Sequence, residues 1–281
     1  MKKRLVLFLL TLVFLISCSK GLKSEKIEEN ALSNMAGGKS SSYVEKNLKK
    51  NLDRKNVDKF IKLVDDYNER VGSDKLVSGF TTNLRPPYDL GGLVEQFHKS
   101  KGDFPPSNCR INTFLLLKDD IKVSPHMNVD DSLLFMDEEM LEKSKLLTKD
   151  ERDDFESVFS RVKTKSSKDP KVHAKVMKKH LEKIDFPENV HMLSVIIHDN
   201  LDGNYLFIGH VGVLEKIDGG YLFVEKLSFE EPYQVIKFKS KKDAYKYLAY
   251  KYENFKDPNT APPFIMDNDD YVEIDWFWLY F

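Results

Sequence analysis

Cys109 is the residue of this sequence that is best suited to covalent chemistry. The chain has two cysteines. Cys18 follows an N-terminal apolar run, where its sulfur is expected to carry lipid, so Cys109 is left without a disulfide partner. Ser107 or Asn108 can cap a helix, and an apolar run from Ile111 to Leu117 follows. We therefore expect Cys109 in the first turn of a buried helix, where the backbone dipoles lower the pKa of a thiol.

His210 is the histidine whose setting best fits a partner for this thiol. A nucleophilic cysteine is activated by an imidazole, which a third group holds in the correct tautomer. His210 lies on a predicted strand of large apolar residues, between the small residues Gly209 and Gly212. We expect the glycines to leave space beside the ring for another chain or for a substrate backbone.

Glu225 is the candidate for the third group, on the condition of one strand register. If Asp218-Gly219 occupies the turn between the two strands, His210 and Glu225 are diagonal neighbours on one face, with backbones roughly 7–8 Å apart. If Gly219-Gly220 forms the turn instead, Glu225 lies opposite Leu214 and is too far from the imidazole.

The donors for an oxyanion are less defined by the sequence. The backbone N–H of Cys109 is the default donor, and Asn108, Tyr88 and Gln96 are weaker side-chain candidates. A structural role for Cys109, as a small buried hydrophobic residue, is the alternative to catalysis.

Composition and the other histidines exclude several classes of function. With 44 Lys and Arg against 45 Asp and Glu, the net charge of −1 gives no electrostatic case for nucleic-acid binding. Two cysteines cannot form a disulfide framework. His173 and His180 share a helix face and His191 and His198 flank a strand, but no third ligand converges on either pair, so we expect neither a metal nor a cofactor.

The N-terminus has the pattern of a lipoprotein signal. A basic head is followed by an apolar run from Leu5 to Ile16, and Leu15-Ile16-Ser17-Cys18 resembles the bacterial lipobox, in which the cysteine carries the lipid. Removal of residues 1–17 takes away three basic residues and changes the net charge from −1 to −4. Acyl chains on Cys18, rather than electrostatic attraction, are therefore expected to hold the protein on the outer side of the cell membrane.

The remaining sequence predicts a tether and one α+β domain. Residues 18–42 are rich in Ser, Lys, Glu, Asn and Gly and are expected to form a flexible tether, followed by a single domain at 43–281 with an N-terminal helical part and a C-terminal antiparallel sheet. Apolar spacing and capping residues predict two helices within 43–71 and further helices near 93–98, 109–117, 148–162, 169–184 and 240–252. Alternating segments predict strands at 192–198, 205–215, 221–227 and 235–238 and from 271 onward.

The order of these motifs resembles the papain-like fold, particularly bacterial NlpC-type cell-wall peptidases. A cysteine at a helix start, His210-Val211-Gly212-Val213 on a strand and a polar residue on the next strand carry the resemblance. It implies Cys109 as nucleophile, His210 as base and Glu225 as the group that orients His210. The chain departs from those enzymes in having Asn-Cys-Arg-Ile where they usually have Asp-Cys-Ser-Gly, and in the 101 positions that separate residue 109 from residue 210.

The mature chain as a whole also resembles an uncharacterised family of Gram-positive lipoproteins, domain of unknown function 4300. The lipobox, the centre at Ser107-Asn108-Cys109-Arg110 and the strand Gly209-His210-Val211-Gly212-Val213 carry this second resemblance, which implies no activity.

Together these observations predict a lipid-anchored extracytoplasmic cysteine hydrolase or acyl transferase. Its substrate would be an amide bond in a peptide or a peptidoglycan-like molecule, and it would use no cofactor. The alternative is a non-catalytic binding lipoprotein that has kept a degenerate papain-like fold.

Overall fold

The structure is a computed structural model of the full chain, and it describes residues 27–101, 107–125, 129–255 and 257–274. The predicted signal peptide and Cys18, the predicted site of lipidation, lie outside the described residues, as does the end of the chain after position 274.

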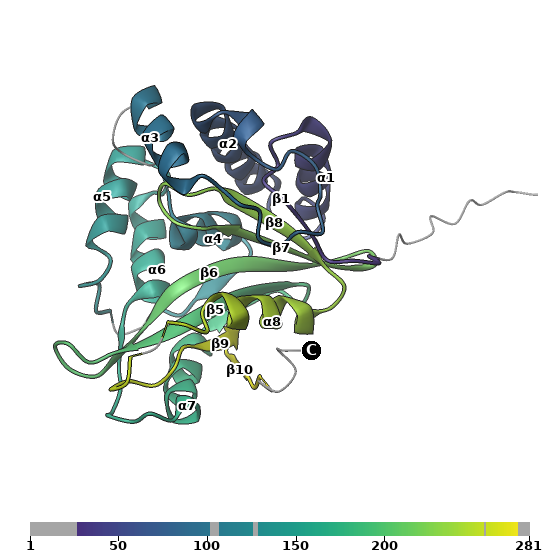
Figure 1. The fold of residues 1–281 in the computed structure, drawn as a ribbon. Helices are drawn as coiled ribbons and strands as arrows, with labels where there is room; N and C mark the ends of the chain where they lie inside the picture. Colours follow the sequence, from purple (N-terminus) through teal and green to yellow (C-terminus); the bar gives the residue numbers. More distant parts are fainter. Residues whose placement is uncertain (1–26, 102–106, 126–128, 256, 275–281) are drawn as a thin grey trace, which may run out of the picture.

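An antiparallel sheet is the centre of the described structure (Figure 1). Eight strands belong to it in the described residues, in the order β1-β8-β7-β6-β5-β9-β10, with β3 paired to β6. These strands are β1 (Ala31–Ser33), β3 (Val162–Lys163), β5 (Val190–Asp199), β6 (Tyr205–Ile217), β7 (Gly220–Lys226), β8 (Tyr233–Phe238), β9 (Phe264–Asp267) and β10 (Asp270–Val272). A separate pair is formed by β2 (Lys122–Val123) and β4 (Ile184–Asp185).

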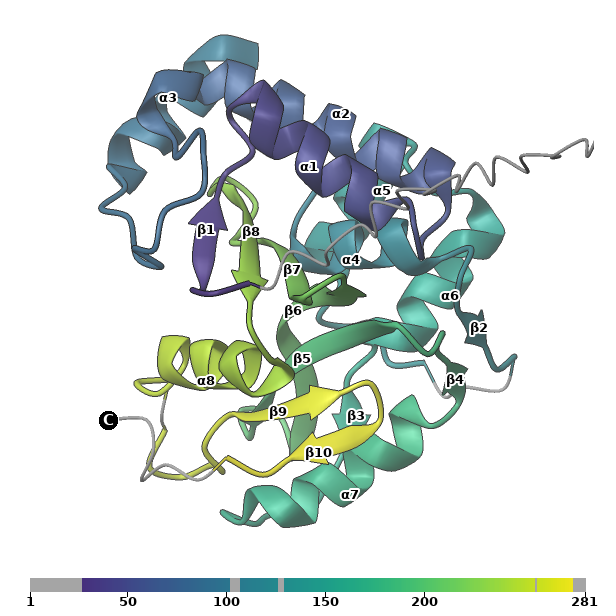
Figure 2. The same cartoon turned by 90° about the vertical axis from the view of Figure 1, so that its right-hand side faces the viewer.

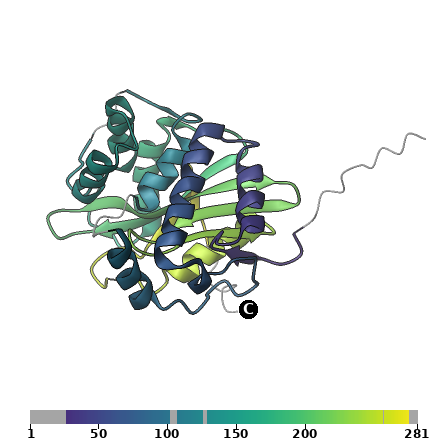
Figure 3. The ribbon, with the colours of Figure 1, turned by 90° about the horizontal axis from the view of Figure 1, so that it is seen from above.

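The helices lie on both faces of the sheet. They are α1 (Gly38–Leu48), α2 (Arg54–Val71), α3 (Leu90–Lys101), α4 (Cys109–Leu117), α5 (Phe135–Ser144), α6 (Lys149–Phe159), α7 (Pro170–Leu181) and α8 (Lys241–Lys251), with a short 3₁₀ turn at Ser73–Lys75. Seen from above, the purple α1 and the blue α2 run over the sheet (Figure 3). Helix α8 packs on the opposite face, and α7 lies beside β10 (Figure 2).

The alternation of apolar residues along the central strands explains this two-sided arrangement. Val211 and Val213 of β6 face the core that includes residues of α1, α2, α4 and α6. Leu214 of β6 and Phe223 of β7 instead join Leu248 of α8 in a second core on the other face. Successive side chains of a strand point to opposite faces, so strands with apolar side chains on both faces need helices on both sides. The α+β prediction is confirmed.

Most of the predicted elements are present at nearly the expected bounds. The helices predicted within 43–71, at 148–162 and at 169–184 form, and so do the strands predicted at 192–198, 205–215 and 221–227. Helix α6 begins with a capping box of Thr148 and Glu151, and α7 begins with the N-cap Asp169 followed by Pro170. Strand β9 was not predicted; its four residues pair with the neighbouring β10 on one side and with β5, which lies far away in the chain, on the other.

The expected tether is wrong in its C-terminal part. Strand β1 pairs with β8, with Leu32 opposite Ile236, and α1 begins at Gly38 instead of after residue 42. Leu32 is fully buried in spite of its polar surroundings in the sequence. Local composition cannot show such burial, because the partner strand is contributed by the other end of the chain.

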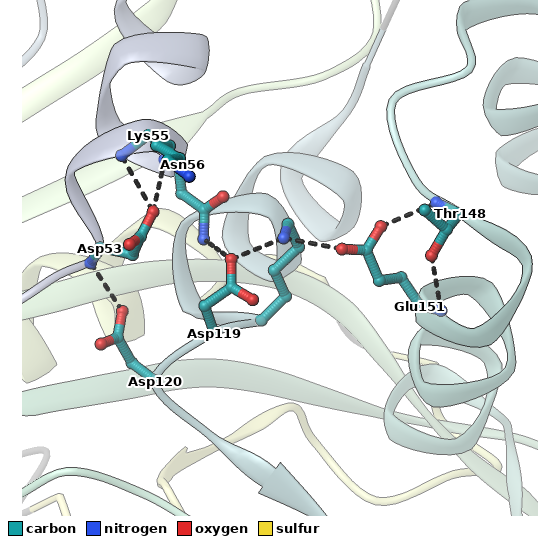
Figure 4. A network of polar contacts seen from close by, with 8 residues as sticks. Asp53, Lys55, Asn56, Asp119, Asp120, Thr148 and Glu151 are labelled. Carbon is teal, nitrogen blue, oxygen red and sulfur yellow. Dashed lines mark hydrogen bonds and ion pairs between the residues drawn. The ribbon is translucent and has the colours of Figure 1, made fainter.

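A polar network fixes the C-terminal end of α4 against its neighbours (Figure 4). Asp119 accepts a hydrogen bond from the amide of Asn56 in α2, at 2.8 Å. Lys118 lies 2.6 Å from Asp119 and 2.7 Å from Glu151 of α6, and its side chain is 7% exposed. Asp53 caps α2 through the backbone N–H groups of its first turn. Three helices are therefore joined at the end of α4 that lies away from Cys109.

Glu215 of β6 is a fully buried residue whose carboxyl group lies on the face of the sheet that α1 and α2 cover. Its Oε1 accepts a hydrogen bond of 2.8 Å from Asn51, while Oε2 has no partner among the described residues. Burial raises the pKa of Glu215 to about 7, against which the hydrogen bond from Asn51 and the charge of Lys50 act only partly. The folded state therefore favours the uncharged form.

We expect Glu215→Gln to make stability less dependent on pH. Because the pKa is raised from 4.5 to about 7 on folding, the stabilisation is complete below the lower value and is lost as the pH rises through the higher one. When the pH is raised from about 5 to about 8, the native protein should lose about 2 kcal/mol of unfolding free energy through Glu215, and the variant should not show this loss. Urea unfolding at both pH values measures this difference, and equal pH profiles for the two proteins would contradict it.

Candidate active site

Cys109 is the first residue of α4, as the sequence predicts. The side chain of Asn108 caps the helix by accepting a hydrogen bond of 2.9 Å from the N–H of Ile111. As the first residues of a helix, Cys109 and Arg110 have backbone N–H groups without an intrahelical acceptor. Cys109 is 7% exposed and is a free thiol.

His210 follows a bulge in β6. In the pairing with β5, His210 lies opposite Val195 and Ile208 lies opposite Ile196, so Gly209 is the extra residue. A Cβ atom at Gly209 would lie 2.2 Å from Cδ1 of Ile197, so a larger residue at this position would displace the side chain of Ile197. The packing around the bulge therefore favours a glycine directly before the histidine.

The expectation that the glycines leave space for another chain or a substrate is wrong. The position of a Cβ atom at Gly212 is 2.6 Å from the ring of Phe223 and 2.6 Å from the carbonyl oxygen of Val224. Beside Gly209, Ile197 takes the space in the same way. The protein's own packed atoms use the room that each glycine provides, since interiors leave few empty volumes.

The hairpin register brings Glu225 to His210. Gly212 pairs with Glu225 and Ile217 with Gly220, so the turn is at Asp218-Gly219, the first of the two alternatives. Gly219 has φ of +87°, a conformation that favours glycine. His210 Nε2 lies 2.5 Å from Glu225 Oε2, and the two residues are 1% and 2% exposed. The geometry proposed for Glu225 is therefore present.

Helix α4 reaches the point at which β6 and β7 separate. The pairing of these strands ends at Gly212 and Glu225, while β6 continues beside β5, and α4 contacts both β6 and β7. The thiol of Cys109 hydrogen-bonds the imidazole of His210. Since Nε2 of the ring is engaged by Glu225, Nδ1 is the nitrogen that faces the thiol.

The electrostatics of the pair favour a thiolate and an imidazolium. Burial by itself raises the pKa of Cys109, but the hydrogen bond to His210 and the positive charges of His210 and Arg110 outweigh it, so the pKa is lowered. Burial and Lys251 lower the pKa of His210, whereas its bonds to Cys109 and Glu225 raise it above its usual value. Both shifts favour transfer of the proton from the sulfur to the imidazole, which is the direction that a cysteine nucleophile requires.

Two residues of α8 hold the carboxylate of Glu225 from the other side. The hydroxyl of Tyr247 donates to Oε1 at 2.6 Å, and the ammonium of Lys251 donates to Oε2 at 2.9 Å. Although burial raises the pKa of Glu225, Lys251 and His210 bring it down to about 2. Sequence reasoning missed both residues, although their spacing of four positions places them on one face of the predicted helix.

The proposed role of Asn108 as an oxyanion donor is not supported by its contacts. Its side-chain Oδ1 caps α4, and its Nδ2 donates to Oδ1 of Asp137 at 2.6 Å. The hydroxyl of Tyr88 donates to Asn34, and Gln96 lies half-buried on α3. The backbone N–H of Cys109 is left as the default donor, because its direction is set by the helix start.

Arg110 is held by a buried carboxylate. Asp137 of α5 is fully buried; its Oδ1 accepts from Nε of Arg110 at 3.0 Å and its Oδ2 accepts from Nη2 at 2.5 Å. This two-point contact fixes the planar guanidinium beside Cys109. Asp137 was not identified from the sequence, and neither was the helix α5 that carries it.

Two cavities border the site. One, of about 700 Å³, is lined in part by Tyr88, Gln234, Tyr247 and Lys251, on the side of Glu225. The other, of about 650 Å³, has Arg110 in its wall.

Neither a metal cluster nor a membrane-spanning helix is found in the described ranges. No three of their His, Cys, Asp or Glu side chains are placed to hold a metal ion together. None of the helices from α1 to α8 has the length and apolar character needed to cross a bilayer.

We expect Asp137→Asn to destabilise the fold by about 3 kcal/mol, because it leaves the guanidinium of Arg110 without its charged partner in a buried site. Glu139→Gln is the matched control on the same helix, since Glu139 forms an exposed pair with Lys143 and should change stability by less than about 0.5 kcal/mol. Urea unfolding followed by circular dichroism measures both. Equal changes in unfolding free energy for the two substitutions would show that the buried pair contributes no more to stability than the exposed pair.

Comparisons with known proteins give a family but no described activity. No curated protein and no solved structure matches the chain. One family model matches residues 31–272, a span that extends from β1 to β10 and includes the residues of the site; its description is Domain of unknown function (DUF4300).

Proposed function

The chain belongs to the DUF4300 family, and from its site we propose that it is a cysteine hydrolase or acyl transferase that acts on amide bonds. The observation that carries this proposal is the buried series Cys109, His210 and Glu225, with a lowered pKa at the thiol and a raised pKa at the imidazole. A purely structural cysteine has no need of a charged imidazole held by a buried carboxylate.

Each residue has one role in the proposed reaction. Sγ of Cys109 attacks the carbonyl carbon, and the backbone N–H at the start of α4 stabilises the negative oxygen. The C–N bond then breaks, and the amine leaves with the proton from His210, which gives a thioester on Cys109. Water or an acceptor amine attacks the thioester, His210 takes its proton, and the thiolate leaves. Glu225 keeps Nδ1 of His210 directed at the sulfur throughout.

The cellular setting of this activity is part of the proposal. A papain-like domain held outside the cell by lipid on Cys18 would meet cell-wall peptides, and a peptide or peptidoglycan-like molecule is therefore the substrate class that fits both the chemistry and the lipobox. The alternative is a binding lipoprotein without catalysis. Two observations favour it, because both restrict access to the thiol and the imidazole: Cys109 has a low exposure, and the ring centroid of Tyr252 lies 5.5 Å from that of His210.

Alkylation of Cys109 as a function of pH tests the proposed thiolate. In the chain with Cys18→Ser, Cys109 is the only thiol, and we expect half-maximal reactivity with iodoacetamide well below the usual thiol pKa of about 8.5. His210→Ala should move the midpoint to that value or above, and Glu225→Gln should move it part of the way. A thiol that reacts only after denaturation would contradict the catalytic role.

Trapping of the thioester tests the reaction itself. Incubation with peptidoglycan fragments and quenching in acid should leave an acyl group on Cys109, detected by intact-mass spectrometry, that is absent in Cys109→Ala. Cys109→Ala should lower turnover by at least about a thousandfold, because it removes the nucleophile. Fragments that bind without an adduct or turnover would favour the binding lipoprotein.

A further inference from the structure

The cavity of about 650 Å³ beside Arg110 is in contact with the residues next to both members of the cysteine–histidine pair. Arg110 follows Cys109 and lines this cavity. Ile197 and Phe207 also line it, and both lie against Gly209, the residue before His210. A group in this cavity would therefore lie beside the bond that Cys109 attacks.

From this position we propose that the cavity binds an uncharged aromatic or branched aliphatic side chain of the substrate. The inference rests on the proposed function, and it names the kind of residue that the site selects. Ligand sites of this size commonly have mostly apolar walls with a few polar groups that set orientation.

The walls of the cavity include apolar side chains that the described chain leaves exposed. Phe255 is 60% exposed and Leu201 is 92% exposed, and both line the cavity. Ile197, Phe207 and Leu133 continue the apolar wall. A group of exposed apolar residues around one cavity is typical of a binding site, whereas single exposed apolar residues are common on any protein surface.

The charges at the cavity exclude a carboxylate as the preferred ligand. The guanidinium of Arg110 is neutralised by its two-point contact with Asp137. Nδ1 of His198 accepts a hydrogen bond of 3.1 Å from the N–H of Ala261, and its Nε2 lies 3.1 Å from Oδ1 of Asn204, so both ring nitrogens already have partners within the protein. Asp199 and Asp257 are the acidic residues of the wall, and they would repel a negative group.

The other cavity provides a contrast within the same protein. Its walls carry charged side chains of both signs, among them Arg85, Lys246 and Asp243, so it suits a polar or charged part of the substrate. The apolar side chain is therefore assigned to the cavity on the Arg110 side.

Two alkylating reagents of different shape test this assignment without a known substrate. In the Cys18→Ser chain, the rates of reaction with N-benzyliodoacetamide and with iodoacetamide are measured at one pH. The ratio of the two rates is divided by the same ratio for glutathione, which removes the intrinsic difference between the reagents and defines the benzyl preference. Because one aromatic ring buried on the cavity wall contributes about 1.5 kcal/mol, we expect a preference of about tenfold for the benzyl reagent.

Phe255→Ala should lower this preference severalfold, and because the preference is a ratio of two rates on the same variant, a change in thiol reactivity that affects both reagents equally cancels. Phe135→Ala is the matched control, because Phe135 is 68% exposed on α5 and does not line the cavity, and it should leave the preference as it is. Both side chains are on the surface, so both variants should fold.

The outcomes separate this inference from the proposed function. If Cys109 reacts as an activated thiol with both reagents but shows no benzyl preference, or a preference that Phe255→Ala does not change, the apolar subsite is overturned and the thiol chemistry stands. If Cys109 is no more reactive than in His210→Ala, the proposed function fails, and the subsite fails with it.

Discussion

The contact between His210 and Glu225 is the interaction on which the rest of the site depends. Both side chains are almost completely buried, so each has lost its hydration, and a buried pair of this kind is favourable only when further hydrogen bonds complete it. Tyr247 and Lys251 provide those bonds to the carboxylate. The helix that carries them lies on the face of the sheet opposite α4, so the histidine is oriented correctly only when both faces are packed.

Helix α4 is held at both ends, and this restricts where the sulfur of Cys109 can lie. At its C-terminal end, Lys118 and Asp119 join it to α2 and α6. At its N-terminal end, Asn108 and Arg110 both bind the buried Asp137 of α5. A nucleophile on a short helix with fixed ends needs little reorganisation before reaction, which is the condition for efficient positioning.

Gly209 connects the histidine with the apolar cavity. The bulge at this glycine turns His210 toward the separation between β6 and β7, and the missing side chain lets Ile197 lie across the strand as part of the cavity wall. The position of the imidazole and the shape of the neighbouring wall therefore depend on the same residue. A change there would alter both, because a packed interior transmits a displacement instead of absorbing it.

The sequence by itself determined the features that arise within a few residues. The start of α4 at Cys109 follows from its cap, and the hairpin between β6 and β7 follows from its turn residues, but the sequence left two registers open and the structure decided for the turn at Asp218-Gly219. Only the tertiary structure decided that residues 31–33 join the sheet, that Asp137 and Lys251 reach the site, and that the protein's own side chains fill the space beside the glycines. Caps and turns act through neighbouring backbone groups, whereas these contacts join segments far apart in the chain, and their partners exist only after the sheet has formed.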